Sequence, residues 1–173
     1  TVTLEITGRG TGLEQTGDSF MYGSDLLLSS NPLVHLNGQS VFTGNVAISS
    51  ADNVIVGSGS GHPARLNAGG NLSIDAGGDV QVINEGGNAA EVTANGTMTI
   101  NLVGTGPNKL IVSADSSAGG FARIWSGGNQ SIDFKNANTH QLNLSAGTGS
   151  APAGASAMIE TDGSQAILNS GGG

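Results

Sequence analysis

The sequence predicts an all-β fold built from short strands that are joined by tight turns. Two observations lead to this prediction. Apolar and polar residues alternate in brief bursts along the chain, as they do in strands with one buried face. Glycine, with 30 of the 173 residues, stands with asparagine in nearly every gap between bursts, and a chain so rich in glycine, serine, asparagine and threonine disfavours long helices.

The alternation places strands at regular intervals. The opening segment 1–7 puts Val2, Leu4 and Ile6 on one face and ends at a glycine-rich turn. The later bursts lie about ten residues apart, which is the spacing of short strands joined by tight turns. Their centres are Val46/Ile48, Val54/Val56, Leu72/Ile74, Val80/Val82, Met98/Ile100/Leu102, Leu110/Val112, Ile132/Phe134 and Leu142/Leu144, with weaker ones near Leu66, Val92, Ile124, Met158 and Ile167.

An eight-residue unit repeats in the middle of the chain. Residues 67–74 (NAGGNLSI) are followed at once by 75–82 (DAGGDVQV), and a looser copy covers 84–91. Glycine pairs supply the positive φ angles of sharp turns, and the apolar, polar, apolar triplet after them suits one rung of a repetitive sheet. A rung needs neighbours from the same chain or from other copies. We therefore expect a repetitive β-helix-like, β-prism-like or sandwich architecture.

The pattern divides the chain into three parts. Residues 1–40 are less repetitive and are expected to form an N-terminal anchoring or capping β segment. Residues 41–145 are expected to form a repetitive shaft or body. Residues 146–173 combine a linker rich in glycine, alanine and serine with a C-terminal strand.

Composition argues against several functions. Thirteen acidic and five basic residues give a net charge of −8, too few cations for nucleic acid or an anionic membrane surface, and no apolar run is long enough for membrane insertion. The chain has no cysteine, and His35, His62 and His140 are far apart, so we expect no metal site and no cofactor. Calcium held by carboxylates of adjacent rungs is a minor alternative.

Paired carboxylates are the only sequence feature that suggests catalysis. Asp75 and Asp79, or Glu160 and Asp162, are close enough in sequence to suggest glycoside hydrolysis. However, the sister repeats carry asparagine at the positions of Asp75 and Asp79, which indicates turn formation. We therefore expect no enzymatic activity.

One segment has the composition of a carbohydrate-binding surface. Alternation over 121–125 places Phe121, Arg123 and Trp125 on one face. An exposed tryptophan beside an arginine can stack a sugar ring and donate hydrogen bonds to its hydroxyls. The alternative, favoured by the scarcity of large side chains, is that Phe121 and Trp125 fill the interior.

The run 68–82 (AGGNLSIDAGGDVQV) resembles repeats of two families, the β-helical adhesins related to filamentous haemagglutinin and the β-rich trimeric fibres, spikes and head fibres of tailed bacteriophages. The short, acidic, cysteine-free chain is more similar to the phage group. That resemblance implies a non-enzymatic fibre, spike or capsid-decorating protein on the virion surface. Its N-terminal segment would bind other virion proteins, and a host surface glycan is an expected partner.

Other functions remain open at this stage. The first alternative is a carbohydrate-binding β-solenoid or adhesin module, extracellular or on a cell surface. A weaker alternative is a spike that degrades polysaccharide.

The low content of large apolar residues favours association. Ordering the backbone costs about 1 to 2 kcal/mol per residue, and only burial of apolar surface can offset that cost on this scale. A core shared among three chains would close the deficit and cover exposed sheet edges. The sequence therefore predicts an intertwined homotrimer.

Overall fold

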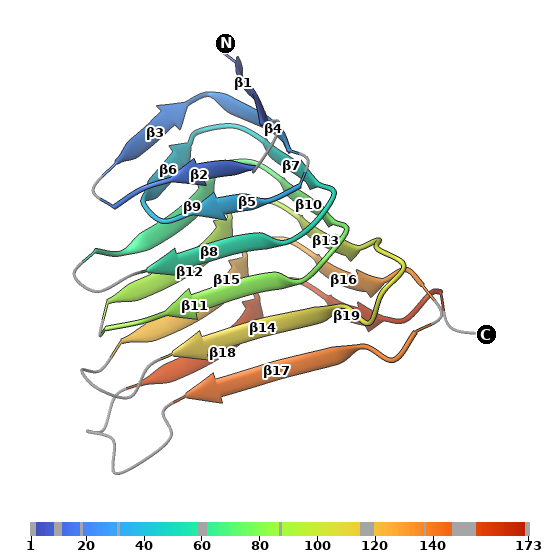
Figure 1. Ribbon diagram of the computed structural model, residues 1–173. Coiled ribbons are helices and arrows are strands. Elements are labelled where there is room, and N and C mark those ends of the chain that lie inside the picture. The colour runs from blue at the N-terminus through green and yellow to red at the C-terminus, as the bar shows by residue number, and fades with distance from the viewer. Residues whose placement is uncertain are drawn as a thin grey trace.

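The chain winds into a stack of coils with three strands each. The computed structural model describes residues 3–8, 12–17, 19–30, 32–58, 62–86, 88–114, 120–136, 138–146 and 155–171, which contain strands β1 to β19. The coils widen from the N-terminal end, blue in Figure 1, toward the C-terminal end. Among these residues there is no helix that could cross a membrane.

The first side of the stack, sheet A, contains every third strand from the first. All its neighbouring strands run parallel. Its members are β1 (Thr3–Gly8), β4 (Asp25–Ser30), β7 (Val46–Ser50), β10 (Leu72–Ala76), β13 (Met98–Leu102), β16 (Gln130–Phe134) and β19 (Gln165–Leu168).

The second side, sheet B, follows sheet A in each coil and is also parallel throughout. Its members are β2 (Leu13–Gln15), β5 (Val34–Leu36), β8 (Val54–Ser58), β11 (Val80–Asn84), β14 (Lys109–Ala114) and β17 (Gln141–Ala146).

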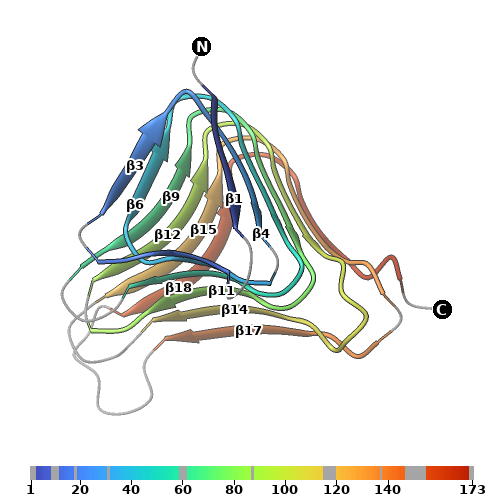
Figure 2. The same cartoon turned by 45° about the horizontal axis from the view of Figure 1, so that its top comes forward.

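The third side, sheet C, closes each coil and is parallel as well. Its members are β3 (Phe20–Gly23), β6 (Gln39–Phe42), β9 (Ala64–Ala68), β12 (Ala89–Ala94), β15 (Phe121–Ser126) and β18 (Ser156–Thr161). The three sheets enclose a triangular cross-section (Figure 2), so the chain is a parallel β-helix.

The predicted all-β, repetitive architecture is confirmed, and of the predicted forms it is the β-helix. The strand pairings of the three sheets join strands of this same chain, so the coils form within one chain. An intertwined arrangement is not needed to build these sheets. The homotrimer itself stays a prediction.

The eight-residue repeats are sides of one coil, not stacked rungs. The unit 67–74 leads through a corner into β10, the unit 75–82 leads through the next corner into β11, and the looser copy leads into β12. Three units therefore pass once around the triangle. The true stacking period here is 26 residues, as in the pairing of Ile74 with Ile48 and Ile100.

Strict alternation builds the interior. In most strands the inward residues are buried and the outward ones partly exposed, as the strict alternation of burial along β10 and β13 shows. Several strands of sheet A end at a small inward residue next to the corner. Two of these, Ser30 and Ser50, donate hydrogen bonds to the corner carbonyls of Leu33 and Asn53. Small residues thus fit the narrow angle of the triangle and satisfy its buried polar groups.

A ladder of stacked side chains, mostly asparagines, joins successive coils at the corner between sheets C and A. Asn45 N donates to Asp25 Oδ1, Asn71 N donates to Asn45 Oδ1, and Thr97 N donates to Asn71 Oδ1 at 2.7, 2.9 and 2.9 Å. The same contact recurs between Ser164 N and Asn129 Oδ1 at 3.1 Å. Each corner therefore hydrogen-bonds to the corner of the previous coil.

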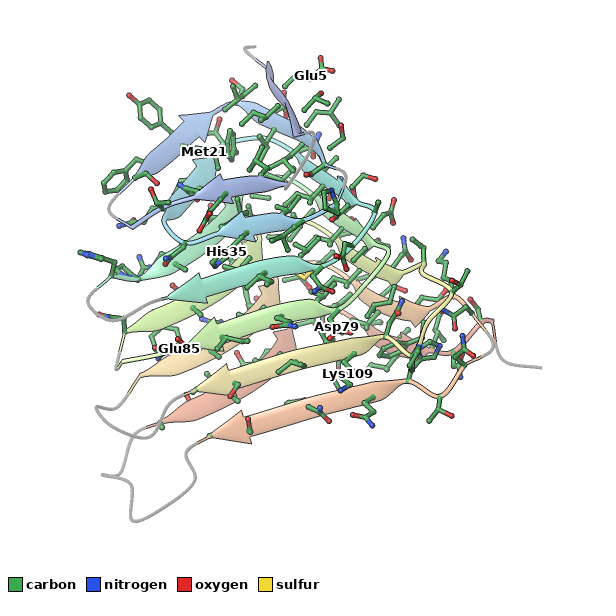
Figure 3. The ribbon with its side chains drawn as sticks, in the orientation of Figure 1. Glu5, Met21, His35, Asp79, Glu85 and Lys109 are labelled. Carbon is green, nitrogen blue, oxygen red and sulfur yellow. The ribbon has the colours of Figure 1, made fainter. Side chains whose placement is uncertain are left out.

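A second ladder holds the corner between sheets A and B. Asp79 N donates to Asn53 Oδ1, and Lys109 N donates to Asp79 Oδ1 at 2.8 Å (Figure 3). Asp79 is thus a corner former, as predicted. Asp75 is not, because it lies in β10 and its Oδ1 accepts a hydrogen bond from Asn101 Nδ2 on β13.

The predicted positive φ is present at Gly86 in the third repeat copy, but the glycine pairs of the two ladder corners serve close approach instead. Among the described residues, positive φ occurs only at Gly12, Gly17 and Gly86, which are not in the glycine pairs of the two ladder corners. A Cβ at Gly77 would instead collide with the carbonyl oxygen of Ala51 in the previous coil. The corners therefore use glycine because consecutive coils nearly touch there.

The described strands of residues 1–40 join the same three sheets as the later ones, and the same is true of β18 and β19 near the C-terminus. The alternation had not indicated β2 to β6 individually. Their role in anchoring stays a prediction, and most of the predicted linker, residues 147–154, lies outside the described part of the chain.

The corner ladder gives a stability prediction for Asn71→Ala. This change removes the acceptor of Thr97 N and of Thr97 Oγ1, which lie 2.9 and 3.0 Å from Asn71 Oδ1. We expect the free energy of unfolding to fall by about 1 kcal/mol in urea denaturation followed by circular dichroism. Asn95→Ala is the control in the same kind of corner, since no side-chain hydrogen bond of Asn95 is present among the described residues. Equal losses in the two variants would contradict the ladder's contribution.

Candidate functional site

The predicted residues Phe121, Arg123 and Trp125 point outward from β15. The inward positions of this strand are Ala122, Ile124 and Ser126, all buried. The shared face is therefore as predicted, and the alternative that Phe121 and Trp125 fill the interior is wrong. The inward face of β15 carries the small residues Ala122 and Ser126 on either side of Ile124, and its large polar and aromatic side chains face outward.

Strand register aligns most of the outward side chains of sheet C into two rows along the solenoid axis. Successive members of a row are about 4.8 Å apart, the spacing of paired strands. The arginine row consists of Phe20, Gln39, Arg65, Glu91, Arg123 and Met158, and the tryptophan row of Tyr22, Val41, Asn67, Thr93, Trp125 and Glu160.

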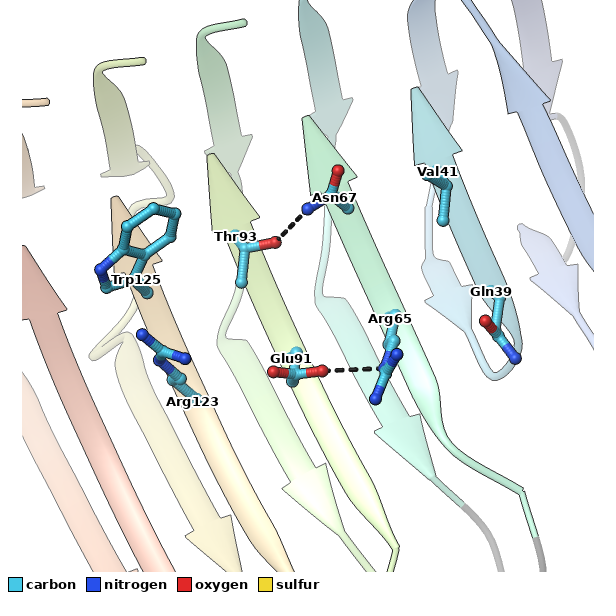
Figure 4. Close-up of a pocket in the computed structure, with 8 residues that line it drawn as sticks. All are labelled: Gln39, Val41, Arg65, Asn67, Glu91, Thr93, Arg123 and Trp125. Carbon is cyan, nitrogen blue, oxygen red and sulfur yellow. Dashed lines mark hydrogen bonds and ion pairs between the residues drawn. The ribbon is translucent and has the colours of Figure 1, made fainter. Parts of the chain in front are cut away.

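The central part of both rows forms a shallow pocket of about 480 Å³. Side chains from β6, β9, β12 and β15 line it, two from each strand (Figure 4). Phe121 lies on the same face of β15 but does not line the pocket. The lining residues are Gln39, Val41, Arg65, Asn67, Glu91, Thr93, Arg123 and Trp125.

Opposite charges are paired across neighbouring coils. Arg65 Nε lies 2.8 Å from Glu91 Oε2, and Arg123 Nε lies 3.2 Å from Glu160 Oε2. The second pair is ionic only, because the buried Arg123 Nε donates no hydrogen bond. Since these are the charged residues on the described outer face of sheet C, that face carries no net charge.

The guanidinium of Arg123 also lies over the indole of Trp125, with Cζ 5.4 Å from the ring centroid. This cation–π contact holds the two planar groups in a defined orientation. Trp125 is half-buried on the outside of the sheet. It therefore offers a fixed aromatic surface at one end of the pocket.

The centre of the pocket offers hydrogen-bonding groups. Asn67 Nδ2 donates to Thr93 Oγ1 at 2.7 Å, which leaves the carbonyl oxygen of Asn67 and the hydroxyl proton of Thr93 for other partners. Amides, hydroxyls and a guanidinium next to an aromatic ring suit a ligand with many hydroxyls and an apolar ring face. Sugars have both.

Two other hollows lack this combination. One of about 320 Å³ on sheet B is lined by side chains that include His35, Ile55 and Glu85, and one of about 440 Å³ lies beside β13, β16 and β19. Neither is lined by phenylalanine, tyrosine, tryptophan or arginine. Sheet C is therefore the best candidate surface.

The carboxylates suggested by sequence are engaged in structural contacts. Asp75 and Asp79 accept the hydrogen bonds described above, one on the outer face of sheet A and the other in a corner. Glu160 is paired with Arg123, and Asp162 follows β18 in the next corner. Within the described ranges, no three His, Asp or Glu side chains are placed to hold a metal ion.

Sequence reasoning found the β15 residues of this pocket but missed its other side chains. Arg65 and Glu91, like Asn67 and Thr93, are 26 residues apart, so a search for the coil period would have aligned them. The eight-residue repeat is more conspicuous in the sequence than the 26-residue coil period. It corresponds to single sides of the triangle and therefore did not indicate which residues stack.

No family model matches the chain, and neither a curated protein nor a solved structure matches it.

The outward placement of Trp125 gives a direct test. We expect Trp125→Ala to lower the free energy of unfolding by about 1 kcal/mol, since it loses a cation–π contact and outer-face packing. The neighbouring change Ile124→Ala should cost about 2 to 5 kcal/mol, because Ile124 is fully buried in the core. Urea denaturation followed by circular dichroism measures both. A larger loss for Trp125→Ala would indicate an interior tryptophan.

Proposed function

We propose that this chain is a non-enzymatic attachment module that binds carbohydrate on the outer face of sheet C. The observation that carries the proposal is the pairing of Trp125 with Arg123 at one end of a polar pocket. An aromatic ring stacks on the apolar face of a pyranose, while the surrounding amides, hydroxyls and guanidinium bind its hydroxyls.

The parallel sheet under the pocket supports this proposal. Each pocket strand is hydrogen-bonded on both edges, and its inward residues pack in one continuous core. The pocket side chains therefore start from a rigid surface, and binding has little backbone ordering to offset. Such preorganisation favours recognition of a flexible glycan.

The resemblance to phage fibres and spikes suggests where this module works. Displayed on a virion as a homotrimer, it would attach the particle to a host surface glycan, with the N-terminal segment toward other virion proteins. The same surface would serve an adhesin outside a cell. Both settings need a stable binding face on which positive and negative charges balance. Neither setting requires a catalytic group.

Glycan binding is tested with an array of purified oligosaccharides. We expect the wild-type chain to bind a defined subset and Trp125→Ala to weaken that binding about tenfold or more, because the stacking surface is lost. Affinities are then measured by titration calorimetry on the best ligand.

Leu27→Ala is the matched control for this experiment. Leu27 is 44% exposed on sheet A, so this change also removes a large outward apolar side chain but leaves sheet C intact. Its affinity should equal that of the wild type. Absence of binding by the wild type, or equal weakening by both variants, would reject the proposal. Recovery of an intact glycan after incubation is the expected result for a chain without hydrolase activity.

The homotrimer is tested by light scattering on a sizing column. We expect a mass three times that of the 17.0 kDa chain. Since one chain already closes the core, the contacts would lie between the outer surfaces of complete solenoids. A concentration-independent monomer would overturn the trimer while leaving the glycan site to be judged by its own experiment.

A further inference from the structure

Two exposed aromatic side chains lie at the N-terminal end of the same face of sheet C. Phe20 and Tyr22 on β3 are 64% and 80% exposed. Aromatic residues make up only 3% of the chain, so two of them left in solvent on adjacent outward positions are unusual. They contribute little to the core and are available for contact with a ligand.

Strand register connects these aromatics to the pocket. Tyr22 pairs with Val41, Val41 with Asn67, Asn67 with Thr93, and Thr93 with Trp125. Tyr22 and Trp125 are thus the two aromatic members of the tryptophan row, four strand steps or about 19 Å apart. That distance matches a short oligosaccharide, not a single sugar ring.

The surface between the two aromatics is polar except for Val41 and has no net charge. Gln39 lies next to the ion pair of Arg65 and Glu91 in the arginine row, and Asn67 bonds Thr93 in the tryptophan row. A ligand chain with a carboxylate or sulfate on each unit would meet Glu91 there and gain no unpaired cation, because Arg65 and Arg123 are each paired with a glutamate. A neutral chain meets no such repulsion.

We propose that the two rows form one continuous binding face for an extended neutral oligosaccharide that lies parallel to the solenoid axis. One end of the ligand stacks on Trp125 and the other on Tyr22 with Phe20, and the polar side chains between them bind hydroxyls. This inference rests on the proposed glycan function and adds the ligand's charge, length and direction.

The experiment uses neutral gluco-, manno-, galacto- and N-acetylglucosamine oligosaccharides, from disaccharides to hexasaccharides, with sialylated and uronic-acid chains of equal length. We expect affinity to rise with length in the best neutral series and the acidic chains to bind more weakly. Tyr22→Ala should bind the hexasaccharide about tenfold more weakly yet bind the disaccharide like the wild type. Trp125→Ala should weaken both, and Tyr22→Phe should retain hexasaccharide affinity.

The possible negative results of this experiment can be told apart. Tyr22 is too exposed to affect folding, which a thermal melt of each variant verifies, and Leu27→Ala controls for loss of an outward apolar group. Binding that is independent of length, or unchanged in Tyr22→Ala, overturns the continuous face but leaves the Trp125 site. Preference for acidic chains overturns the neutral ligand. If the wild type binds no oligosaccharide, the proposed function fails and this inference fails with it.

Discussion

The corner between sheets C and A is the constraint on which the rest of the structure depends. From the second coil onward it contains three residues, as in 43–45, 69–71 and 162–164, and side-chain acceptors join most of these corners to the previous coil. The other corners can lengthen, for example from 77–79 to 103–108 between sheets A and B. Coils therefore widen, with stacked residues 20 apart near the N-terminus and 35 apart near the C-terminus, while this corner stays in register.

Constant register brings residues at regular sequence intervals together on the outer surface of sheet C. Successive strands of sheet C pair without a shift along the strand direction. Their outward residues therefore form straight rows rather than a scattered patch. Side chains separated by 26 residues become neighbours, and oppositely charged ones pair. A ligand that follows a row would meet one new side chain at each strand step, so the proposed recognition of an extended chain uses the same geometry that stabilises the fold.

Local alternation was sufficient to predict the fold class and most strands from β7 onward. It failed for β2 to β6, where β2, β3, β5 and β6 are only three or four residues long and Leu26–Leu28 looks like a continuous apolar run. In the structure Leu26 and Leu28 are buried and Leu27 is outward, so the period of two was present but too short to recognise. The site followed the same rule. The face of Phe121, Arg123 and Trp125 depends on one strand and was predicted, whereas Arg65, Glu91 and Tyr22 depend on coil lengths that no local pattern contains.

Alanine contributes much of the buried core in this chain, in which large apolar residues are scarce. Among the residues that the structure describes, seven alanines, including Ala64, Ala68 and Ala94, belong to the buried cluster of this one chain. Ala64, Ala68 and Ala94 lie at the ends of sheet C strands, where the chain turns toward the adjacent side of the triangle. Central residues such as Leu66 fill the middle of the triangle. Dispersion contacts in a closely packed interior grow with the number of close neighbours and not with side-chain size alone. A chain poor in large apolar residues can therefore close its own core, and aromatic residues such as Tyr22 and Trp125 can lie on the outer surface, where the proposed glycan would stack on them.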